Sequence, residues 1–182
     1  MKIQDLELSG LKLIELDVHG DSRGFFVERF NAEKMKALGF ELNIAQVNHS
    51  RSAPHVVRGL HFQHTPPQGK LVGCTHGRVF DVAVDVRANS QTFGKWYGVE
   101  LSDLNGRLLW VPPGFAHGFS VLGEAPADVT YFVDAVYNQK GEFGIRFDDP
   151  EIAVDWQAGN PVVSQRDLNA PSFAEYRKNP MF

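Results

Sequence analysis

The sequence lacks the features that mark secreted or membrane proteins. It contains a single cysteine, Cys74, so no intrachain disulfide can form and a reducing compartment fits best. No stretch approaches the ~20 apolar residues that a membrane helix needs. Residues 1–10 lack the basic region and apolar run of a signal peptide. We therefore expect a soluble, cytoplasmic protein with no membrane partner.

The sequence also lacks a basic surplus, long repeats and linkers. Its formal net charge is −4, whereas a nucleic-acid surface normally shows as a basic excess, so no nucleic-acid partner is expected. Hydrophobic residues make up 43% and charged residues 22% of the 182 residues, which is the balance of a folded protein with one sizeable core. We predict a single domain over residues 1–182.

Period-two alternation of apolar and polar residues dominates the chain. The clearest strand spans residues 80–87, whose even positions are all apolar: Phe80, Val82, Val84 and Val86. Residues 96–101 and 107–111 are predicted to form a strand pair joined by Asn105-Gly106 as a tight hairpin. Shorter strands are expected over residues 11–30 and 129–133. Regular short strands with turn signals between them favour an all-β barrel or sandwich.

Two short helices interrupt this strand pattern. Asn31 can cap a helix that runs through Met35, and Gly39 stands where helices commonly end in a left-handed conformation. Near the C-terminus, Ser164 followed by Asp167 resembles a capping box with Asp in the Glu position. A second short helix is therefore predicted there.

A histidine-containing strand is the first candidate for chemistry. Alternation over residues 58–64 places His61 and Gln63 on one face and Arg58 on the other. An imidazole and an amide then share a surface. Taken alone, such a histidine is more often a satisfied interior side chain than a catalytic one.

A second histidine lies in a recognisable spacing. Gly106, Pro112, Gly114 and His117 fit the second half of the cupin signature. The first half expects His-x-His followed by a glutamate, but this chain has His61-x-Gln63 and no acidic residue between His64 and Asp81. The ligands of a mononuclear metal site are thus missing, and no metal is expected.

From residue 20 to residue 171 the chain resembles the dTDP-4-dehydrorhamnose 3,5-epimerase family, a group of metal-independent cupins. The resemblance rests on segments in the family's order: 21–28, 46–48, 58–63, Lys70, 80–82, 112–119, 142–145, 149–150 and 166–167. It implies an all-β cupin jelly-roll barrel with short flanking helices. It also implies an isomerase without a cofactor that inverts C3 and C5 of a dTDP-4-keto-6-deoxyhexose.

The resemblance assigns roles that suit this chemistry, because C3 and C5 both flank the C4 ketone. His61 would be the base, and Asp167 would fix its tautomer and increase its basicity. Tyr131 would return a proton from the other face, and Lys70 would stabilise the C4 oxyanion. Taken singly, Asp167 is more simply a helix cap, Tyr131 an aromatic residue of a strand and Lys70 a solvated charge. Only their joint occurrence favours the catalytic interpretation.

The resemblance also implies a set of substrate-binding residues. They are Arg23, Phe26, Glu28, Gln46, Asn48, Arg58, Lys70, His117, Tyr137, Glu142 and Arg166. Arg23 and Arg58 would suit a pyrophosphate, because a guanidinium can bind two oxygens, and Tyr137 would stack on thymine. In the family the segment around Arg23 often completes the neighbouring subunit's site, which implies a homodimer.

Three alternatives remain open from the residues. Between Tyr131 and Gly141 the chain departs from the family's pattern, which leaves a single-position epimerase acting at C3 or C5. A metal-dependent cupin isomerase would use His61, His64 and His117. A sugar-binding cupin without catalysis would have no need of Tyr131 or Asp167.

Overall fold

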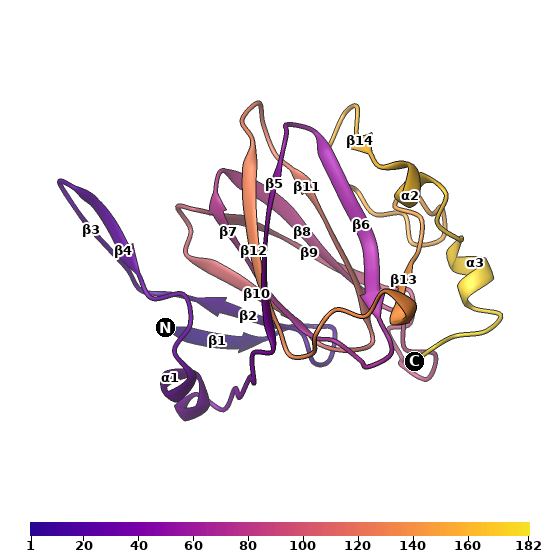
Figure 1. Cartoon of the computed structure of the whole chain (residues 1–182), viewed down its shortest axis with the longest axis horizontal. Coiled ribbons are helices and arrows are strands. Elements are labelled where there is room, and N and C mark those ends of the chain that lie inside the picture. Colours follow the sequence, from indigo (N-terminus) through magenta and orange to yellow (C-terminus); the bar gives the residue numbers. More distant parts are fainter.

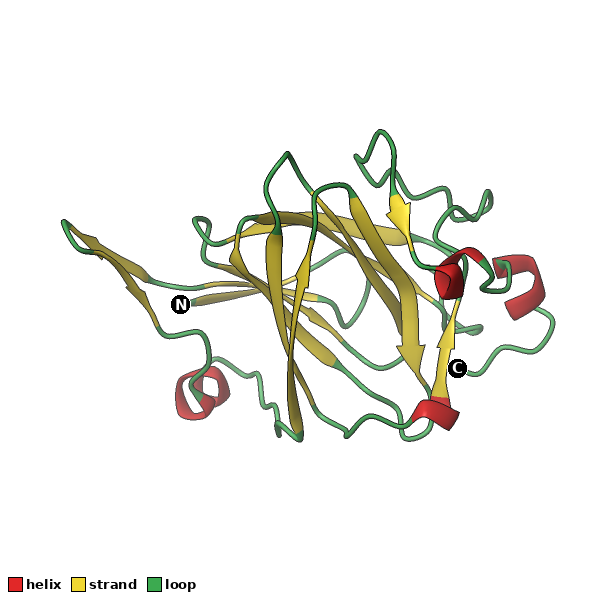
Figure 2. Ribbon diagram, turned by 45° about the horizontal axis from the view of Figure 1, so that its top comes forward, coloured by secondary structure: helices red, strands yellow, loops and turns green.

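Two β-sheets face each other and enclose the core (Figures 1 and 2). The structure, a computed structural model, describes residues 1–182. Sheet I has the strand order β1 (Lys2–Asp5), β2 (Lys12–Glu15), β10 (Arg107–Val111), β7 (Lys70–His76), β12 (Ala127–Val133) and β5 (Gln46–Ser52). Sheet II has the order β13 (Glu142–Gly144), β6 (Val56–Gln63), β11 (Phe115–Val121), β8 (Arg78–Asp85) and β9 (Trp96–Ser102), with β14 (Val162–Val163) beside β6. This is the all-β jelly-roll barrel expected from the sequence.

The central core lies between the inner faces of the two sheets. Val72 and Leu109 of sheet I pack in one apolar cluster with Val79, Leu101 and Phe119 of sheet II. All five side chains are less than 5% exposed. Apolar burial of this kind is the main stabilising term of a domain of this size and gives the pocket a rigid base.

A second apolar layer covers the outer face of sheet II. The predicted alternation on β8 is confirmed, because Phe80, Val82, Val84 and Val86 all face this layer, although the strand ends at Asp85. The C-terminal segment supplies the other side of the layer. Its members include Ile145, Phe147, Trp156, Phe173 and Tyr176, the last two in helix α3 (Phe173–Tyr176). The C-terminal segment is therefore part of the core.

Helix α1 (Ala32–Ala37) packs against the outer face of sheet I. As predicted, the Asn31 side chain accepts a hydrogen bond from the Lys34 amide, and Gly39 has a φ of +80° just after the helix. Met35 is the buried residue of the helix and joins an apolar cluster with Leu71 and Leu108.

The predicted hairpin between residues 96–101 and 107–111 is wrong. The Asn105-Gly106 turn exists, and Asn105 accepts hydrogen bonds from the amides of Ser102 and Arg107. However, β9 pairs with β8 in sheet II, whereas β10 pairs with β2 and β7 in sheet I. The turn takes the chain from one sheet to the other, because Leu101 and Leu109 bury their side chains in the same central core from opposite sides.

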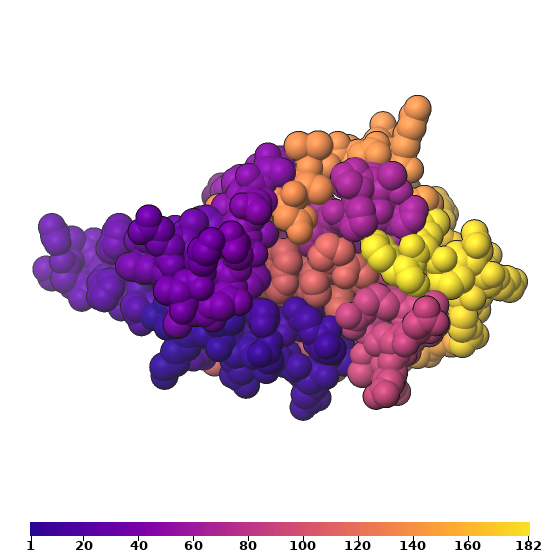
Figure 3. All heavy atoms as spheres, turned by 90° about the horizontal axis from the view of Figure 1, so that it is seen from below, coloured from indigo at the N-terminus to yellow at the C-terminus, as the bar shows by residue number.

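A two-stranded hairpin projects from the N-terminal part of the barrel. Strands β3 (Val18–Asp21) and β4 (Gly24–Val27) pair only with each other. The hairpin extends away from the two sheets, and the space-filling view shows it as the purple projection (Figures 1 and 3). Its apolar side chains Phe25 and Phe26 are 51% and 67% exposed. Separately, none of the helices has the length and hydropathy needed to cross a membrane.

Candidate active site

A pocket of about 500 Å³ opens between the two sheets. Its walls come from the inner faces of β5, β7 and β12 on one side and β6 and β11 on the other, with β13 and helix α2 (Gln165–Leu168) at the edge. Most of the residues predicted from the sequence line it. These are Gln46, Asn48, Arg58, His61, Lys70, His117, Tyr131, Tyr137, Glu142 and Asp167.

His61 and Asp167 form a hydrogen-bonded pair at the wall of the pocket. The His61 Nε2–H group donates to Asp167 Oδ1 at 2.6 Å, which leaves Nδ1 as the acceptor nitrogen of the ring. Burial alone would raise the pKa of Asp167. The hydrogen bond and charge of His61, together with the Gly59 amide and Ser164, outweigh it and hold the pKa below its usual value. Asp167 is therefore a carboxylate that fixes the histidine tautomer.

Arg58 faces the same pocket as His61, which corrects the predicted alternation. In β6, His61 pairs with His117 and Arg58 pairs with Phe119, so two residues of β6, Gly59 and Leu60, lie opposite the single residue Gly118 of β11. Such a β-bulge shifts the alternation by one position. Gly59 permits it: its φ is +132°, and a Cβ atom there would lie 2.6 Å from the Gly118 Cα.

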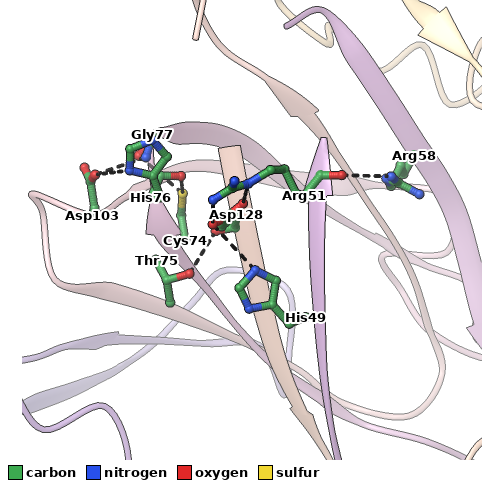
Figure 4. Close-up of polar contacts among 9 residues, drawn as sticks. All are labelled: His49, Arg51, Arg58, Cys74, Thr75, His76, Gly77, Asp103 and Asp128. Atoms are coloured by element: carbon green, nitrogen blue, oxygen red, sulfur yellow. Dashed lines mark hydrogen bonds and ion pairs between the residues drawn. The ribbon is translucent and has the colours of Figure 1, made fainter. Parts of the chain in front are cut away.

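The guanidinium of Arg58 is anchored by strand β5. Its Nε donates to Ser52 Oγ at 2.9 Å, and one terminal nitrogen donates to the Arg51 carbonyl at 3.4 Å. Arg51 is itself paired with Asp128 on β12 through two hydrogen bonds of 2.7 Å (Figure 4). The contacts with β5 thus hold Arg58 in place at the wall of the pocket, where it is a fixed cation that can bind an anionic ligand.

His117 forms a second histidine–carboxylate pair, deeper in sheet II. Its Nε2 lies 3.0 Å from both carboxylate oxygens of Asp81, on the neighbouring strand β8. Asp81 is fully buried and the His117 side chain is 9% exposed. The sequence identified His117 but assigned no role to Asp81. Asp81 therefore holds the His117 ring in place, and only the small exposed part of the ring faces the pocket.

Lys70 is a buried cation on β7. Its Nζ donates to the His61 carbonyl at 3.0 Å, so it lies beside the histidine strand. Burial lowers the pKa of Lys70 to about 8, although the charges of Glu142 and Asp81 act in the opposite direction. An ammonium in such a site is poorly solvated and interacts strongly with any negative charge that develops nearby.

Tyr131 stands on the sheet opposite His61. It lies on β12, directly across from Asn48 on β5, whereas His61 lies on β6 of sheet II. Burial raises the pKa of Tyr131, Glu142 adds to this effect and Arg58 opposes it. The phenol therefore keeps its proton at neutral pH, and the pocket has a proton acceptor on one wall and a proton donor on the other.

A polar cluster joins the loop after β12 to the rest of the site. The Tyr137 amide donates to Gln46 Oε1 at 3.0 Å, and Gln46 Nε2 donates to Asn48 Oδ1 at 2.7 Å. The Tyr137 hydroxyl donates to Glu142 Oε2 at 2.8 Å. Arg166 does not line the pocket, but its guanidinium contacts the same Glu142 oxygen at 2.8 Å.

Besides Arg166, three predicted residues do not line this pocket and lie away from it. Arg23 lies in the β3–β4 turn with a side chain that is 87% exposed and paired with Asp21. Phe26 is exposed on β4, and Glu28 forms an ion pair with Lys34 at 2.8 Å. Phe26 and Glu28 line a separate recess of about 80 Å³ beside the N-terminus.

The structure also places residues in the pocket that the sequence analysis missed. Ser50 lies on the inward face of β5 after Gln46 and Asn48, and its buried hydroxyl has no hydrogen-bond partner. Gln68 lines the pocket and donates to the Ala135 carbonyl at 2.6 Å. Period-two alternation starting from Gln46 was a signal that could have found Ser50; no local signal pointed to Gln68.

Gln63, which stands where the cupin signature has its second histidine, has a structural role. Gln63 donates to the carbonyls of Pro66 and Val136 at 3.0 and 3.1 Å, and accepts from the Asn138 amide at 2.8 Å. It therefore holds the loop that carries Tyr137. No three histidine, cysteine or acidic side chains gather in a metal-binding group anywhere in residues 1–182.

The comparisons with known proteins show which family this chain resembles. Residues 5–175 match the family model described as dTDP-4-dehydrorhamnose 3,5-epimerase. The dTDP-4-dehydrorhamnose 3,5-epimerase of Shigella flexneri is 45% identical over 177 residues, covering 96% of this chain and 97% of that protein. The 4-keto-6-deoxy sugar epimerase NovW from Streptomyces spheroides has a similar structure, with a TM-score of 0.94, 36% identity and coverage of 100% and 92% of the two chains.

A further solved structure carries a ligand. The dTDP-6-deoxy-D-glucose-3,5-epimerase of Legionella pneumophila, in complex with dTDP-4-keto-L-rhamnose, has a TM-score of 0.88 and 46% identity, covering 94% of this chain and 92% of that chain. Family model, curated relative and solved structures thus agree over nearly the whole chain. The chain belongs to the dTDP-4-dehydrorhamnose 3,5-epimerase family, whose members are isomerases.

Proposed function

We propose that this protein inverts C3 and C5 of dTDP-4-keto-6-deoxy-D-glucose to give dTDP-4-keto-L-rhamnose. The observation that carries the proposal is the placement of His61 and Tyr131 on opposing sheets around one pocket. Inversion requires a proton to leave from one face of a carbon and return to the other. An acceptor and a donor on facing walls supply this arrangement.

The proposed steps use the same groups twice. The acceptor nitrogen of His61 removes the proton from the carbon next to the C4 ketone, and the electron pair moves to the ketone oxygen to form an enolate. The ammonium of Lys70 stabilises that oxygen, and Tyr131 donates its phenolic proton to the opposite face of the carbon as the ketone re-forms. His61 then releases its extra proton to solvent, and the Tyr131 phenolate takes one up from solvent. Because C3 and C5 flank the same ketone, one Lys70 serves both carbons.

The nucleotide half of the substrate is assigned to the other end of the pocket. Arg58 is the fixed cation for the pyrophosphate, since β5 anchors its guanidinium. Tyr137, which is 53% exposed at the pocket's edge, offers its ring face to the thymine. Gln46, Asn48 and His117 supply polar contacts between these two ends.

We further propose a homodimer in which the hairpin completes the partner's pocket. Arg23, Phe26 and Glu28 are apart from the pocket of their own chain, and the hairpin that carries Arg23 and Phe26 pairs with no other strand of that chain. Strand β5 is the last strand of sheet I and has an unpaired edge beside the pocket. A two-fold arrangement would cover both exposed features.

The protein is proposed to act as a single domain in the cytoplasm. The residues that line the pocket are spread from β5 to α2, so the site cannot be assigned to one part of that stretch alone. Cys74, the one cysteine, is buried and free, which suits a reducing compartment.

Incubation of dTDP-4-keto-6-deoxyglucose with the protein in heavy water tests the proposal. The expected product carries deuterium at both C3 and C5 with both centres inverted, as read by proton NMR. Deuterium and inversion at only one carbon would instead identify a single-position epimerase. Loss of turnover on exhaustive chelation, restored by one added metal, would identify the metal-dependent cupin. Tight nucleotide binding without exchange at either carbon would leave a sugar-binding protein.

A further inference from the structure

Helix α2 carries two adjacent side chains to two different parts of the site. Asp167 reaches His61, and Arg166 reaches Glu142 on β13 at 2.8 Å. The helix is a single turn of four residues in which Asp167 is the only buried residue, while Leu168 is 42% exposed. No apolar side chain of α2 is fully buried, so polar contacts contribute much of what holds the helix in place.

The number of those contacts is small. Ser164 caps the helix, Asp167 binds His61 and the Gly59 amide, and β14 pairs with β6 just before the helix begins. The only other ion pair or side-chain hydrogen bond from α2 is the one between Arg166 and Glu142. Without it, no side-chain hydrogen bond or ion pair joins α2 to β13.

Glu142 is itself well placed to act as an anchor. Its side chain is 17% exposed, and its residue pairs with Gln63 on β6. The Oε2 atom that binds Arg166 also accepts the hydroxyl of Tyr137. One carboxylate oxygen thus joins α2 to the loop proposed to hold the thymine.

We infer that Arg166 is a positioning residue, which holds α2 through Glu142 so that Asp167 keeps His61 in its working tautomer. The inference rests on the proposed function for its kinetic consequence and goes beyond the substrate contact that the family resemblance implies for Arg166. Because Tyr137 shares the same oxygen, the nucleotide end of the pocket is mechanically joined to the proton-transfer end.

Arg166 is the better partner to change. Glu142 also affects the pKa of Lys70 and of Tyr131 by its charge, so its removal would alter several groups at once. Arg166 affects neither of these, and its side chain is 56% exposed, so its replacement should not disturb folding. Arg146 provides a matched control, since it forms an exposed ion pair with Asp148 away from the pocket and is 41% exposed.

The direct test is proton NMR of the ligand-free protein. The Nε2 protons of His61 and His117 are each hydrogen-bonded to a carboxylate and should give separate downfield resonances. The signal of His61 is identified as the one that is missing from the spectrum of His61→Ala. In Arg166→Gln the His61 signal should broaden or vanish while the His117 signal persists, because Asp81 is not attached to α2. Arg166→Lys and Arg146→Gln should retain both signals.

The kinetic test separates positioning from substrate contact. Arg166→Gln should lower kcat by roughly 10- to 100-fold, since small displacements of a catalytic group have effects of that size. Its KM should change by less than about threefold, and Arg166→Lys should recover most of the rate. Thermal unfolding of all three variants should match that of the unmodified protein.

The outcomes distinguish this inference from the proposed function. If Arg166→Gln raises KM alone and leaves both kcat and the His61 resonance unchanged, Arg166 is a substrate contact and the inference is overturned. If the unmodified protein fails to epimerise the sugar nucleotide, the proposed function is overturned, and the NMR test still decides the position of Asp167. If Arg166→Gln fails to fold, Arg166→Met replaces it as the variant without the cation, and retention of the His61 signal in folded Arg166→Met overturns the inference.

Discussion

His61 and His117 lie directly opposite each other across the β6–β11 ladder, yet each ring is bound by a different carboxylate. Asp167 approaches His61 from helix α2, at the edge of sheet II, whereas Asp81 approaches His117 from β8, inside the sheet. The His61 side chain is 26% exposed and the His117 side chain 9%. Both rings line the pocket, and His61 is the more accessible of the two.

Replacing His61 by alanine should remove the base with little loss of packing. We expect kcat to fall by roughly 100- to 10,000-fold, the range typical of a lost general base. The unfolding temperature should change little. His49→Ala is a suitable control because His49 lies on the outer face of β5, and it should retain full activity. A decrease of less than about tenfold for His61→Ala would contradict the assignment.

Replacing Tyr131 by phenylalanine should separate proton exchange from inversion. The ring still fills its place on β12, but the proton donor of that wall is gone. In heavy water the substrate should then acquire deuterium without changing configuration, because His61 removes and returns the proton on one face. Proton NMR of recovered substrate measures both events. Normal inversion by this variant would show that another group is the acid.

The rate should depend on pH through Lys70. Its pKa of about 8 is lowered by burial, and only the protonated form can stabilise an oxyanion. As pH rises through 8 the charge is lost, so kcat/KM should fall on the alkaline side with a midpoint near that value. Tyr131 does not account for this limb, because burial raises its pKa above that of an ordinary tyrosine. A profile that stays flat to pH 10 would rule out this role.

Mixing two inactive variants tests the proposed exchange of hairpins. In a dimer formed from Arg23→Ala and His61→Ala, the site with an intact His61 receives an intact Arg23 from its partner. After subunits are mixed and reassociated, about a quarter of the sites should be whole, and activity should reappear to that extent. If Arg23 serves its own chain, no site is whole and the mixture stays inactive.

Gly59→Ala should disturb both stability and activity. A Cβ atom at this position would meet the Gly118 Cα at 2.6 Å and the His117 carbonyl at 3.0 Å, and φ is +132°. We expect a loss of about 1–3 kcal/mol in the free energy of unfolding, measured by urea denaturation. Gly159→Ala is the matched control, since its Cβ would meet nothing within 4 Å. Equal stability of the two variants would contradict the packing argument.

Local signals in the sequence predicted local structure well. The Asn31 cap, the Gly39 stop and the alternation on β8 all depend on neighbours within a few positions, and all are confirmed. Asp167 has a place in the helix cap and also a contact with His61, so it is not only a cap, and its catalytic role stays a prediction. Its amide donates to the Ser164 cap, and its carboxylate binds His61.

Features set by distant partners were not predictable in this way. The bulge in β6 depends on Gly118 lying against Gly59, and nothing near Gly59 reveals that neighbour. The sheet that β10 joins depends on which face of the core Leu109 fills, not on the Asn105-Gly106 turn. The contact of Arg166 with Glu142 also joins residues from separate elements, α2 and β13, so neither local sequence reveals it.

The His61–Asp167 pair joins positions that are 106 residues apart in the chain. During synthesis on the ribosome, β1 through β13 all emerge before Asp167 does. A nascent chain can therefore present most of the pocket's walls while its histidine still has no carboxylate partner. Turnover is thus a late event in the life of each molecule, and the appearance of activity during translation would report when the C-terminal segment has docked.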